Sequence, residues 1–141
     1  NIMCSPGPNG KMDVKVVDFG LAKITGRDDI DVIKLTQTGA CHGSPPYMSP
    51  EQCLSKAIDF RTDIYAMGCI LYECLVGKSP FYGGSVYETL TMQVTDPAPD
   101  FPASVSVPSE YREMVMRALE KNPDDRQRSV DEIKQVLLKF V

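Results

Sequence analysis

The sequence predicts a mainly α-helical domain with a short β-hairpin at its N-terminus. Two β-rich stretches, residues 1–4 and 14–17, flank a loop rich in Pro and Gly at residues 5–13, which is the pattern of a hairpin. Further along, helix-start signals precede apolar residues at the i, i+3, i+4 spacing. An apolar run from Ile64 to Val76 predicts a central helix that is buried on all sides, because apolar residues occupy every face of it.

The hairpin would bring Asn1 and Asp18 to the same end, since Asp18 follows the return strand directly. Two oxygen-bearing side chains at one place suit a hard cation such as Mg²⁺. Gly20, two residues later, lets the chain turn away sharply. From these residues alone two plainer interpretations stay open: Asn1 is a frayed terminus, and the stretch from Asp18 to Gly20 is a strand that ends in a turn.

Residues 21–43 show no sustained periodicity and are expected to form a mobile loop. The stretch mixes charges with hydroxyls, among them Thr36 and Thr38. His42 beside Cys41 has the residue types of a metal site or of a Cys/His catalytic pair. No third ligand is spaced to join them, so we expect neither.

The helical region begins at a capping signal. Ser49, Pro50 and Gln52 are placed as N-cap, first and third helical residues, which predicts a short helix. Thr62 is expected to cap the central helix, and Gly77 is expected to end it.

Three more helices have signals of the same kind. Ser85 with Glu88, and Ser129 with Glu132, have capping-box spacing. The helix between them is predicted from apolar residues that recur on one face, namely Tyr111, Met114, Val115, Ala118 and Leu119. The apolar face of the last helix consists of Val130, Ile133, Val136, Leu137 and Phe140. We therefore expect about five helices in all, packed around the central run from Thr62 to Val76.

Composition restricts the function classes. With 141 residues and a net charge of -4, the chain has single-domain length and no basic stripe, so we expect no nucleic-acid partner. The five cysteines form no CxxC pair, which argues against disulfides and zinc and for a reducing, cytoplasmic location. The longest apolar run is too short to cross a bilayer. Whether the parent protein has a membrane anchor elsewhere is left open.

Four motifs follow one another through nearly the whole chain. They are Asp18-Phe19-Gly20, then Gly43-Ser44-Pro45-Pro46-Tyr47-Met48-Ser49-Pro50-Glu51, then Asp63 opening a helix that contains Gly68, then Leu119-Glu120-Lys121-Asn122-Pro123-Asp124-Asp125-Arg126. In this order they resemble the C-terminal lobe of the eukaryotic-type (Hanks-type) serine/threonine protein kinases, and most closely the bacterial members. The resemblance implies the C-lobe part of the α+β protein kinase-like fold, with the N-lobe and most of the catalytic loop absent from this chain.

By this resemblance the chain is one partial kinase domain with three regions. Residues 1–20 would be the end of the catalytic loop and a metal-binding hairpin, residues 21–51 the activation and substrate-binding loop, and residues 52–141 the helical C-lobe. Asp18 and Asn1 would be the catalytic residues that bind Mg²⁺ and, through it, ATP. Phe19 and Gly20 would support the geometry around that site.

The resemblance also gives roles to the loop. Ser44 would position the substrate by contacting the catalytic Asp, which indicates a Ser or Thr acceptor. Thr38, and after it Thr36, are the candidates for activating phosphorylation, because a phosphate there could be ordered by an Arg. The plainer interpretation of the two threonines, a solvated loop, stays open.

Three charged residues would support the lobe. Glu51 is expected to pair with Arg126 and so to anchor the end of the loop to the helices. Asp63 would accept hydrogen bonds from the backbone of the catalytic loop. The alternatives are that Glu51 and Arg126 are unrelated surface charges and that Asp63 only favours the helix dipole.

These implications predict part of a serine/threonine kinase that transfers the γ-phosphoryl group of ATP to protein hydroxyls, with ATP and Mg²⁺ as cofactors and a protein substrate as partner. This chain alone is expected to be inactive, because it contains no Gly-rich loop, no ATP-pairing Lys and no catalytic Asp. The alternative is a non-catalytic lobe that binds proteins through the helices after Gly77.

Overall fold

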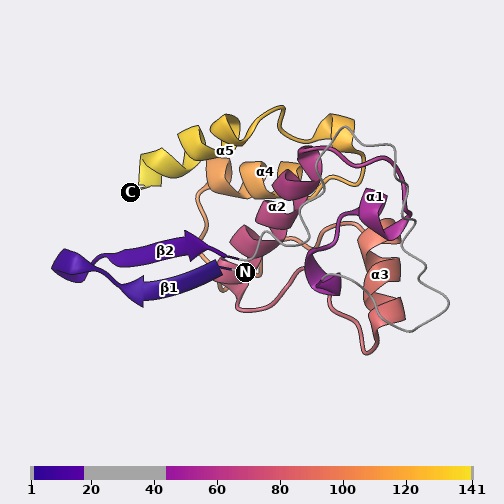
Figure 1. The fold of residues 1–141 in the computed structure, drawn as a ribbon, viewed down its shortest axis with the longest axis horizontal. Coiled ribbons are helices and arrows are strands. Elements are labelled where there is room, and N and C mark those ends of the chain that lie inside the picture. Colours follow the sequence, from indigo (N-terminus) through magenta and orange to yellow (C-terminus); the bar gives the residue numbers. More distant parts are fainter. Residues whose placement is uncertain (1, 18–43, 141) are drawn as a thin grey trace. The chain divides into compact units, whose positions relative to one another are not determined.

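The computed structural model describes residues 2–17 and 44–140, and its contacts divide the chain into an N-terminal unit and a helical unit. Figure 1 shows the elements of both. The first unit contains the hairpin and the second contains five α-helices within its described part. This confirms the predicted fold class, mainly α with an N-terminal β-hairpin.

The hairpin consists of two antiparallel strands, β1 (Ile2–Pro6) and β2 (Met12–Val16). The register pairs Ile2 with Val16 at the open end and Pro6 with Met12 next to the turn. All side chains of the two strands are exposed. In the sequence, Asn1 directly precedes Ile2, and Asp18 follows Val16 by two positions. Asn1 and Asp18 themselves lie outside the described residues.

The turn of the hairpin is tighter than predicted. Residues 5–13 were expected to be loop, but both strands extend into this stretch, and a one-turn 3-10 helix (Pro8–Gly10) fills most of the remainder. The N–H of Gly7 donates to the C=O of Lys11 at 2.7 Å and closes the turn. Proline at the end of an edge strand is tolerated because its missing N–H is least needed there, so Pro6 does not exclude pairing.

The helical unit begins with a one-turn 3-10 helix, η2 (Pro45–Tyr47), followed by α1 (Pro50–Cys53). The predicted capping box is present. The N–H of Ser49 donates to Oε1 of Gln52 at 2.9 Å, and the N–H of Gln52 donates to Oγ of Ser49 at 3.4 Å. This confirms the helix start that the sequence indicates at residue 49.

The central helix is α2 (Arg61–Val76). It ends as predicted at Gly77, whose φ of 81° lies in the left-handed region that glycine tolerates. The prediction of Thr62 as its cap is wrong, because the helix already begins at Arg61 and Thr62 is its second residue. Oδ1 of Asp59 accepts the N–H of Arg61 at 2.9 Å, and the Thr62 hydroxyl is used elsewhere.

Helix α2 is buried on one side and not on all sides. Its buried residues are Thr62, Ile64, Tyr65, Gly68, Cys69 and Tyr72. On the remaining faces Ile70 and Leu71 are half-buried, and the side chain of Leu75 is 39% exposed. A uniformly apolar sequence therefore does not imply uniform burial here, because the helices of this unit cover α2 on one side.

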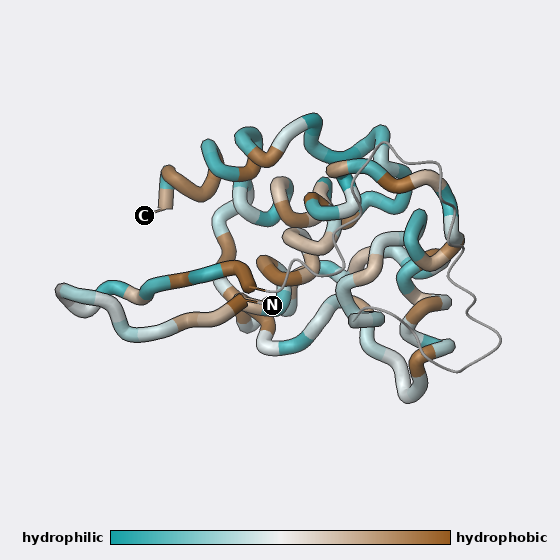
Figure 2. Tube along the Cα trace, viewed as in Figure 1, coloured by the Kyte–Doolittle hydropathy of each residue, from teal (hydrophilic) through white to brown (hydrophobic). Residues whose placement is uncertain are grey.

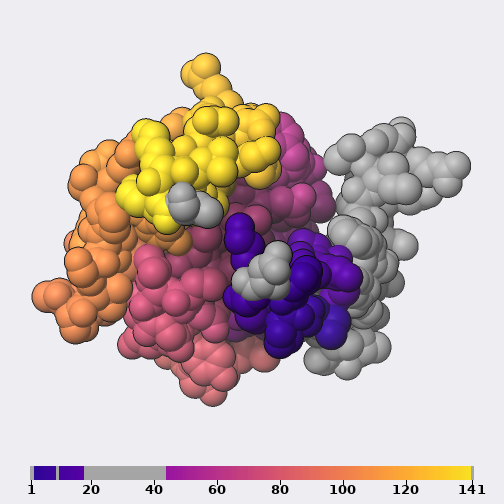
Figure 3. All heavy atoms as spheres, turned by 90° about the vertical axis from the view of Figure 1, so that its left-hand side faces the viewer, coloured from indigo at the N-terminus to yellow at the C-terminus, as the bar shows by residue number. Residues whose placement is uncertain are grey.

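Three further helices complete the unit: α3 (Val86–Thr95), α4 (Ser109–Ala118) and α5 (Val130–Leu137). Single 3-10 turns, η3 (Pro123–Asp125) and η4 (Leu138–Phe140), precede and follow α5. Helix α4 packs against α2, and α3 packs against α1 and η2. Figure 2 shows brown and teal alternating along α5, as expected for an amphipathic helix. In Figure 3 the C-terminal segment (yellow) lies on the orange surface that contains α4.

The predicted caps of α3 and α5 differ in outcome. Oγ of Ser85 accepts the N–H of Glu88 at 3.1 Å, as predicted, while Oε2 of Glu88 accepts from the N–H of Gly84. Ser129 stands at the N-cap of α5, but its side chain makes no capping bond. Both residues mark a helix start correctly, although only Ser85 uses its hydroxyl for it.

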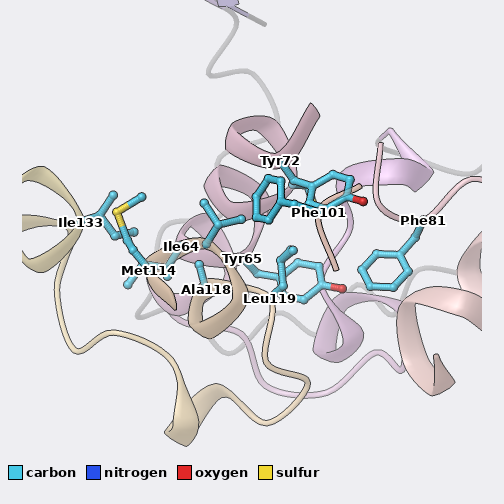
Figure 4. Close-up of a cluster of buried hydrophobic side chains, with 11 residues drawn as sticks. Ile64, Tyr65, Tyr72, Phe81, Phe101, Met114, Ala118, Leu119 and Ile133 are labelled. Carbon is cyan, nitrogen blue, oxygen red and sulfur yellow. The ribbon is translucent and has the colours of Figure 1, made fainter. Parts of the chain in front are cut away.

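The hydrophobic core lies between α2, α4 and α5 and includes Phe81 and Phe101 from the loops (Figure 4). Tyr72 stacks on Phe101 with ring centroids 4.9 Å apart. Where α2 crosses α4, a Cβ placed on Gly68 would lie 2.9 Å from Cβ of Ala118. Glycine therefore permits the close approach of the two helices. Within the described ranges, no helix combines the length and the apolar character needed to cross a membrane.

Candidate functional site

The predicted site residues divide into two groups. Asn1, Asp18, Phe19, Gly20, Thr36 and Thr38 lie outside the described residues. The other four, Ser44, Glu51, Asp63 and Arg126, lie in the helical unit. The structure brings Glu51 and Arg126 into contact.

The stretch Ser44–Met48 forms a tight turn at the start of the helical unit. The N–H of Tyr47 donates to the C=O of Ser44 at 2.9 Å, and the N–H of Met48 donates to the C=O of Pro45 at 3.3 Å. Ser44 is exposed, whereas Met48 is buried. The turn therefore presents Ser44 to solvent while its other end is fixed in the core.

Three side chains from other elements hold this turn. Nε2 of Gln93, on α3, donates to the C=O of Pro45 at 3.1 Å. Oγ of Ser79 donates to the C=O of Pro46 at 3.1 Å. The hydroxyl of Tyr47 donates to Oε2 of Glu73, on α2, at 2.6 Å. Three consecutive residues are thus each tied to a different part of the unit.

The bond to Glu73 changes the acidity of Tyr47. The hydrogen bond to the carboxylate, with burial and the negative charge of Glu73 as further causes, raises the pKa of Tyr47 to about 12. Sequence reasoning did not assign a role to Glu73. A signal was present, because Glu73 is the only charged residue in the apolar run from Ile64 to Val76.

A groove of about 670 Å³ opens beside the turn. Prolines and tyrosines make up much of its lining, and Glu73, Lys78 and Asp100 add charge. A volume of this size is typical of ligand clefts. The groove offers apolar surface together with the carboxylate oxygens of Glu73 and Asp100.

Glu51 and Arg126 form a buried ion pair, as expected. Nη1 and Nη2 of Arg126 each donate to one carboxylate oxygen of Glu51, both at 2.8 Å. Arg126 is 1% exposed and Glu51 is 5% exposed. The hydroxyl of Thr62 donates to Oε1 of Glu51 at 2.9 Å. The pair therefore joins α1, the start of α2 and the stretch before α5.

Every N–H of the Arg126 guanidinium has an acceptor. Besides the two bonds to Glu51, it donates to the carbonyls of Arg61, Glu120 and Lys121 at 2.9, 2.8 and 3.1 Å. The guanidinium also lies over the ring of Tyr65, 4.8 Å from its centroid. A buried cation is tolerated only when its donors are used in this way, so Arg126 ties two backbone segments, at Arg61 and at residues 120–121, to one carboxylate.

The pKa of Glu51 reflects these contacts. Burial by itself would raise it, but the hydrogen bonds from Arg126 and Thr62 outweigh that cost and hold the pKa below its usual value. Asp63 differs. It is exposed in the first turn of α2, and its carboxylate makes no hydrogen bond within the described part of the chain.

Lys121 is another residue that sequence reasoning left without a role. Its Nζ donates to the carbonyls of Met92 and Gln93 at 3.3 and 2.8 Å and to the hydroxyl of Tyr65 at 3.2 Å. Burial lowers the pKa of Lys121 to about 8. No local pattern could have indicated these contacts, because the partners are 28 and more residues away along the chain.

Comparison with known proteins gives one family. A family model described as protein kinase domain matches residues 1–138. The serine/threonine-protein kinase pkn3 of Myxococcus xanthus is 41% identical over 141 residues, which is 97% of this chain and 25% of that protein. The serine/threonine-protein kinase PknB of Mycolicibacterium smegmatis is 39% identical over 127 residues, 89% of this chain and 20% of that protein. PknB of Mycobacterium leprae is 36% identical over 127 residues, with the same shares. The chain thus spans about a fifth to a quarter of the length of these curated relatives.

Proposed function

Because the chain belongs to the protein kinase domain family, with bacterial serine/threonine kinases among its relatives, we propose that it is part of a protein serine/threonine kinase. The reaction is the transfer of the γ-phosphoryl group of ATP to Ser or Thr hydroxyls of a protein substrate. The observation that supports this most is the family match, which runs from residue 1 to residue 138 and includes Asp18-Phe19-Gly20.

In this proposal Asp18 and Asn1 hold Mg²⁺. Their donors are carboxylate and amide oxygens, the ligands that this cation prefers, so the residue types fit the metal. Bound Mg²⁺ supplies charge neutralisation at the ATP phosphates. Asp18 and Asn1 themselves serve to fix the position of the metal and its nucleotide, with Phe19 and Gly20 supporting the backbone beside Asp18.

We propose that the turn Ser44–Met48 contacts the protein substrate, and we call this turn the substrate segment. Its exposed Ser44 and the neighbouring groove lined by prolines and tyrosines suit an extended polypeptide, which supports a protein as the substrate. Upstream of it, Thr38 or Thr36 would be phosphorylated for activation. The proposed regions are a metal-binding part up to residue 20, a loop up to residue 51 and a helical lobe after it, in which Asp63 supports the catalytic loop.

The proposal includes no nucleic-acid partner, in line with the net charge of -4, and a cytoplasmic location, where ATP is available.

The test uses the full-length gene product that carries this sequence. Asp18→Asn removes the charge that binds the metal but keeps the size of the side chain. We expect Mg²⁺-dependent phosphoryl transfer to fall by about 10²-fold or more, with unchanged thermal unfolding. Asp13→Asn, an exposed residue of β2, is the matched control and should keep full activity. Retained Mg²⁺-dependent activity in Asp18→Asn would refute the metal role, and an inactive wild-type protein would refute the kinase function.

A further inference from the structure

The substrate segment is unusual in how it is held. Pro45 and Pro46 have no N–H, so at these positions the backbone can be held only through its carbonyls. Ser79 and Gln93 provide the side-chain donors for these two carbonyls. The two donors differ in burial, because Gln93 is 0% exposed and Ser79 is half-buried. Gln93 is therefore the side chain that connects the segment to the interior.

Both ends of the Gln93 amide are bonded. Nε2 donates to the C=O of Pro45 at 3.1 Å, and Oε1 accepts from the hydroxyl of Tyr65 at 2.6 Å. Tyr65 is itself 0% exposed. A fully buried amide with two partners has one orientation, because turning it over would set donor against donor or acceptor against acceptor.

Lys121 sets the direction of this chain of bonds. Its ammonium group can only donate, so the Tyr65 oxygen accepts from Nζ, at 3.2 Å. The proton of that hydroxyl is then available for Oε1 of Gln93, and the NH₂ group of Gln93 must face Pro45. Each bond in the order Lys121, Tyr65, Gln93 and Pro45 therefore fixes the next one.

Lys121 also holds the helix that carries Gln93. Nζ donates to the carbonyls of Met92 and Gln93 in the last turn of α3, where a cation also interacts favourably with the helix dipole. The ammonium lies 3.7 Å from the ring centroid of Phe81, a favourable cation–π contact. The position of Gln93 is thus set by the backbone of α3 and by its side-chain partners together.

We propose that Gln93 is a positioning residue for the protein substrate: backed by Tyr65 and Lys121, it fixes the Pro45 carbonyl and hence the shape of the substrate segment. The inference rests on the proposed kinase function. Buried hydrogen bonds of this kind add little net stability, yet their direction specifies a geometry that apolar packing does not. Breaking the hydrogen bonds from Lys121 through Tyr65 and Gln93 to Pro45 should therefore weaken recognition of the protein substrate and leave ATP binding unchanged.

The test compares two buried glutamines in the full-length protein. Gln93→Leu removes both hydrogen bonds of the amide, the one to the C=O of Pro45 and the one from the Tyr65 hydroxyl. Gln127→Leu is the matched control, since Gln127 is 3% exposed and its Nε2 donates to the C=O of Met114 at 2.8 Å, away from the segment. For Gln93→Leu we expect the KM for a peptide substrate to rise about tenfold, with an unchanged KM for ATP. The control also replaces a buried amide by an apolar side chain, and it should leave both constants unchanged.

A second readout does not depend on activity. The amides of Tyr47 and Met48 donate within the segment, so their hydrogen exchange reports its local opening. In Gln93→Leu we expect about tenfold faster exchange at both amides. Tyr65→Phe loses only the hydroxyl and should show a smaller increase. Gln127→Leu should show no change.

The outcomes separate the two claims. Unchanged exchange in Gln93→Leu, or faster exchange with an unchanged KM for the peptide, would overturn the positioning role. Equal changes in Gln93→Leu and Gln127→Leu would also overturn it, because they would indicate general destabilisation. If the wild-type protein transfers no phosphate, the kinase function fails, and the exchange rates alone then decide whether Gln93 fixes the segment.

Discussion

The two ends of the stretch from Ser44 to Cys53 are held in different ways. At the Glu51 end, a buried carboxylate meets a guanidinium whose every donor is used, and Arg126 is 1% exposed. At the Tyr47 end, the turn is held by separate hydrogen bonds to side chains of different elements. The comparison indicates that the contacts at the first end anchor the fold. The hydrogen bonds at the second end set the shape of a surface and contribute less to the free energy of unfolding.

The largest expected effect is at the Glu51 end. Arg126→Met leaves the Glu51 carboxylate buried without its partner, so we expect the free energy of unfolding to fall by about 3–5 kcal/mol. Denaturant titration of the full-length protein measures it. Lys139→Met, which breaks the exposed ion pair with Glu110, is the control and should cost about 1 kcal/mol or less. Equal losses in the two variants would contradict the anchoring role.

A smaller effect is expected at the Tyr47 end. Tyr47→Phe removes the hydroxyl that donates to Glu73 and keeps the ring, so the loss should be about 1 kcal/mol in the same titration. Tyr82→Phe is the control, because Tyr82 lines the same groove and is 74% exposed. The comparison between the two ends would fail if Tyr47→Phe cost as much as Arg126→Met.

Lowering the pH should weaken the contacts at the Glu51 end. The folded-state pKa of Glu51 lies below the ordinary value of 4.5, so near that pH the unfolded state binds more protons than the folded state. The stabilising contribution of Glu51 is therefore complete above pH 4.5 and is lost as the pH falls through the folded-state pKa. Glu51→Gln should show a shallower loss of unfolding free energy below pH 5 than the control Glu113→Gln, an exposed residue. Identical pH profiles would show that the Glu51 charge contributes nothing.

Local sequence signals predicted what depends on neighbouring residues. Ser49 with Gln52 and the stop at Gly77 depend only on residues a few positions apart, and both were found where expected. Thr62 shows the limit of this reasoning. Asp59 accepts the N–H of Arg61 near the helix start, and the Thr62 hydroxyl binds Glu51, a partner 11 positions away that no capping rule considers.

The rest of the site depends on tertiary placement. The pairing of Glu51 with Arg126 spans 75 positions and was expected only through the family resemblance. Gln93, Tyr65 and Lys121 are ordinary helix and loop residues in the sequence, and their hydrogen bonds exist because α2, α3 and the stretch after α4 meet. As the single charge in an apolar run, Glu73 indicated a specific contact. Its partner Tyr47, 26 positions away, could be identified only from the structure.

The central claim, that this chain is part of a serine/threonine kinase, is tested most directly by phosphoryl transfer itself. The measurement is the incorporation of phosphate from γ-labelled ATP into a protein substrate by the full-length protein, followed by identification of the modified residues. We predict labelling that requires Mg²⁺ and occurs on Ser and Thr. No labelling in the presence of Mg²⁺ and ATP, or labelling of Tyr alone, would contradict the account.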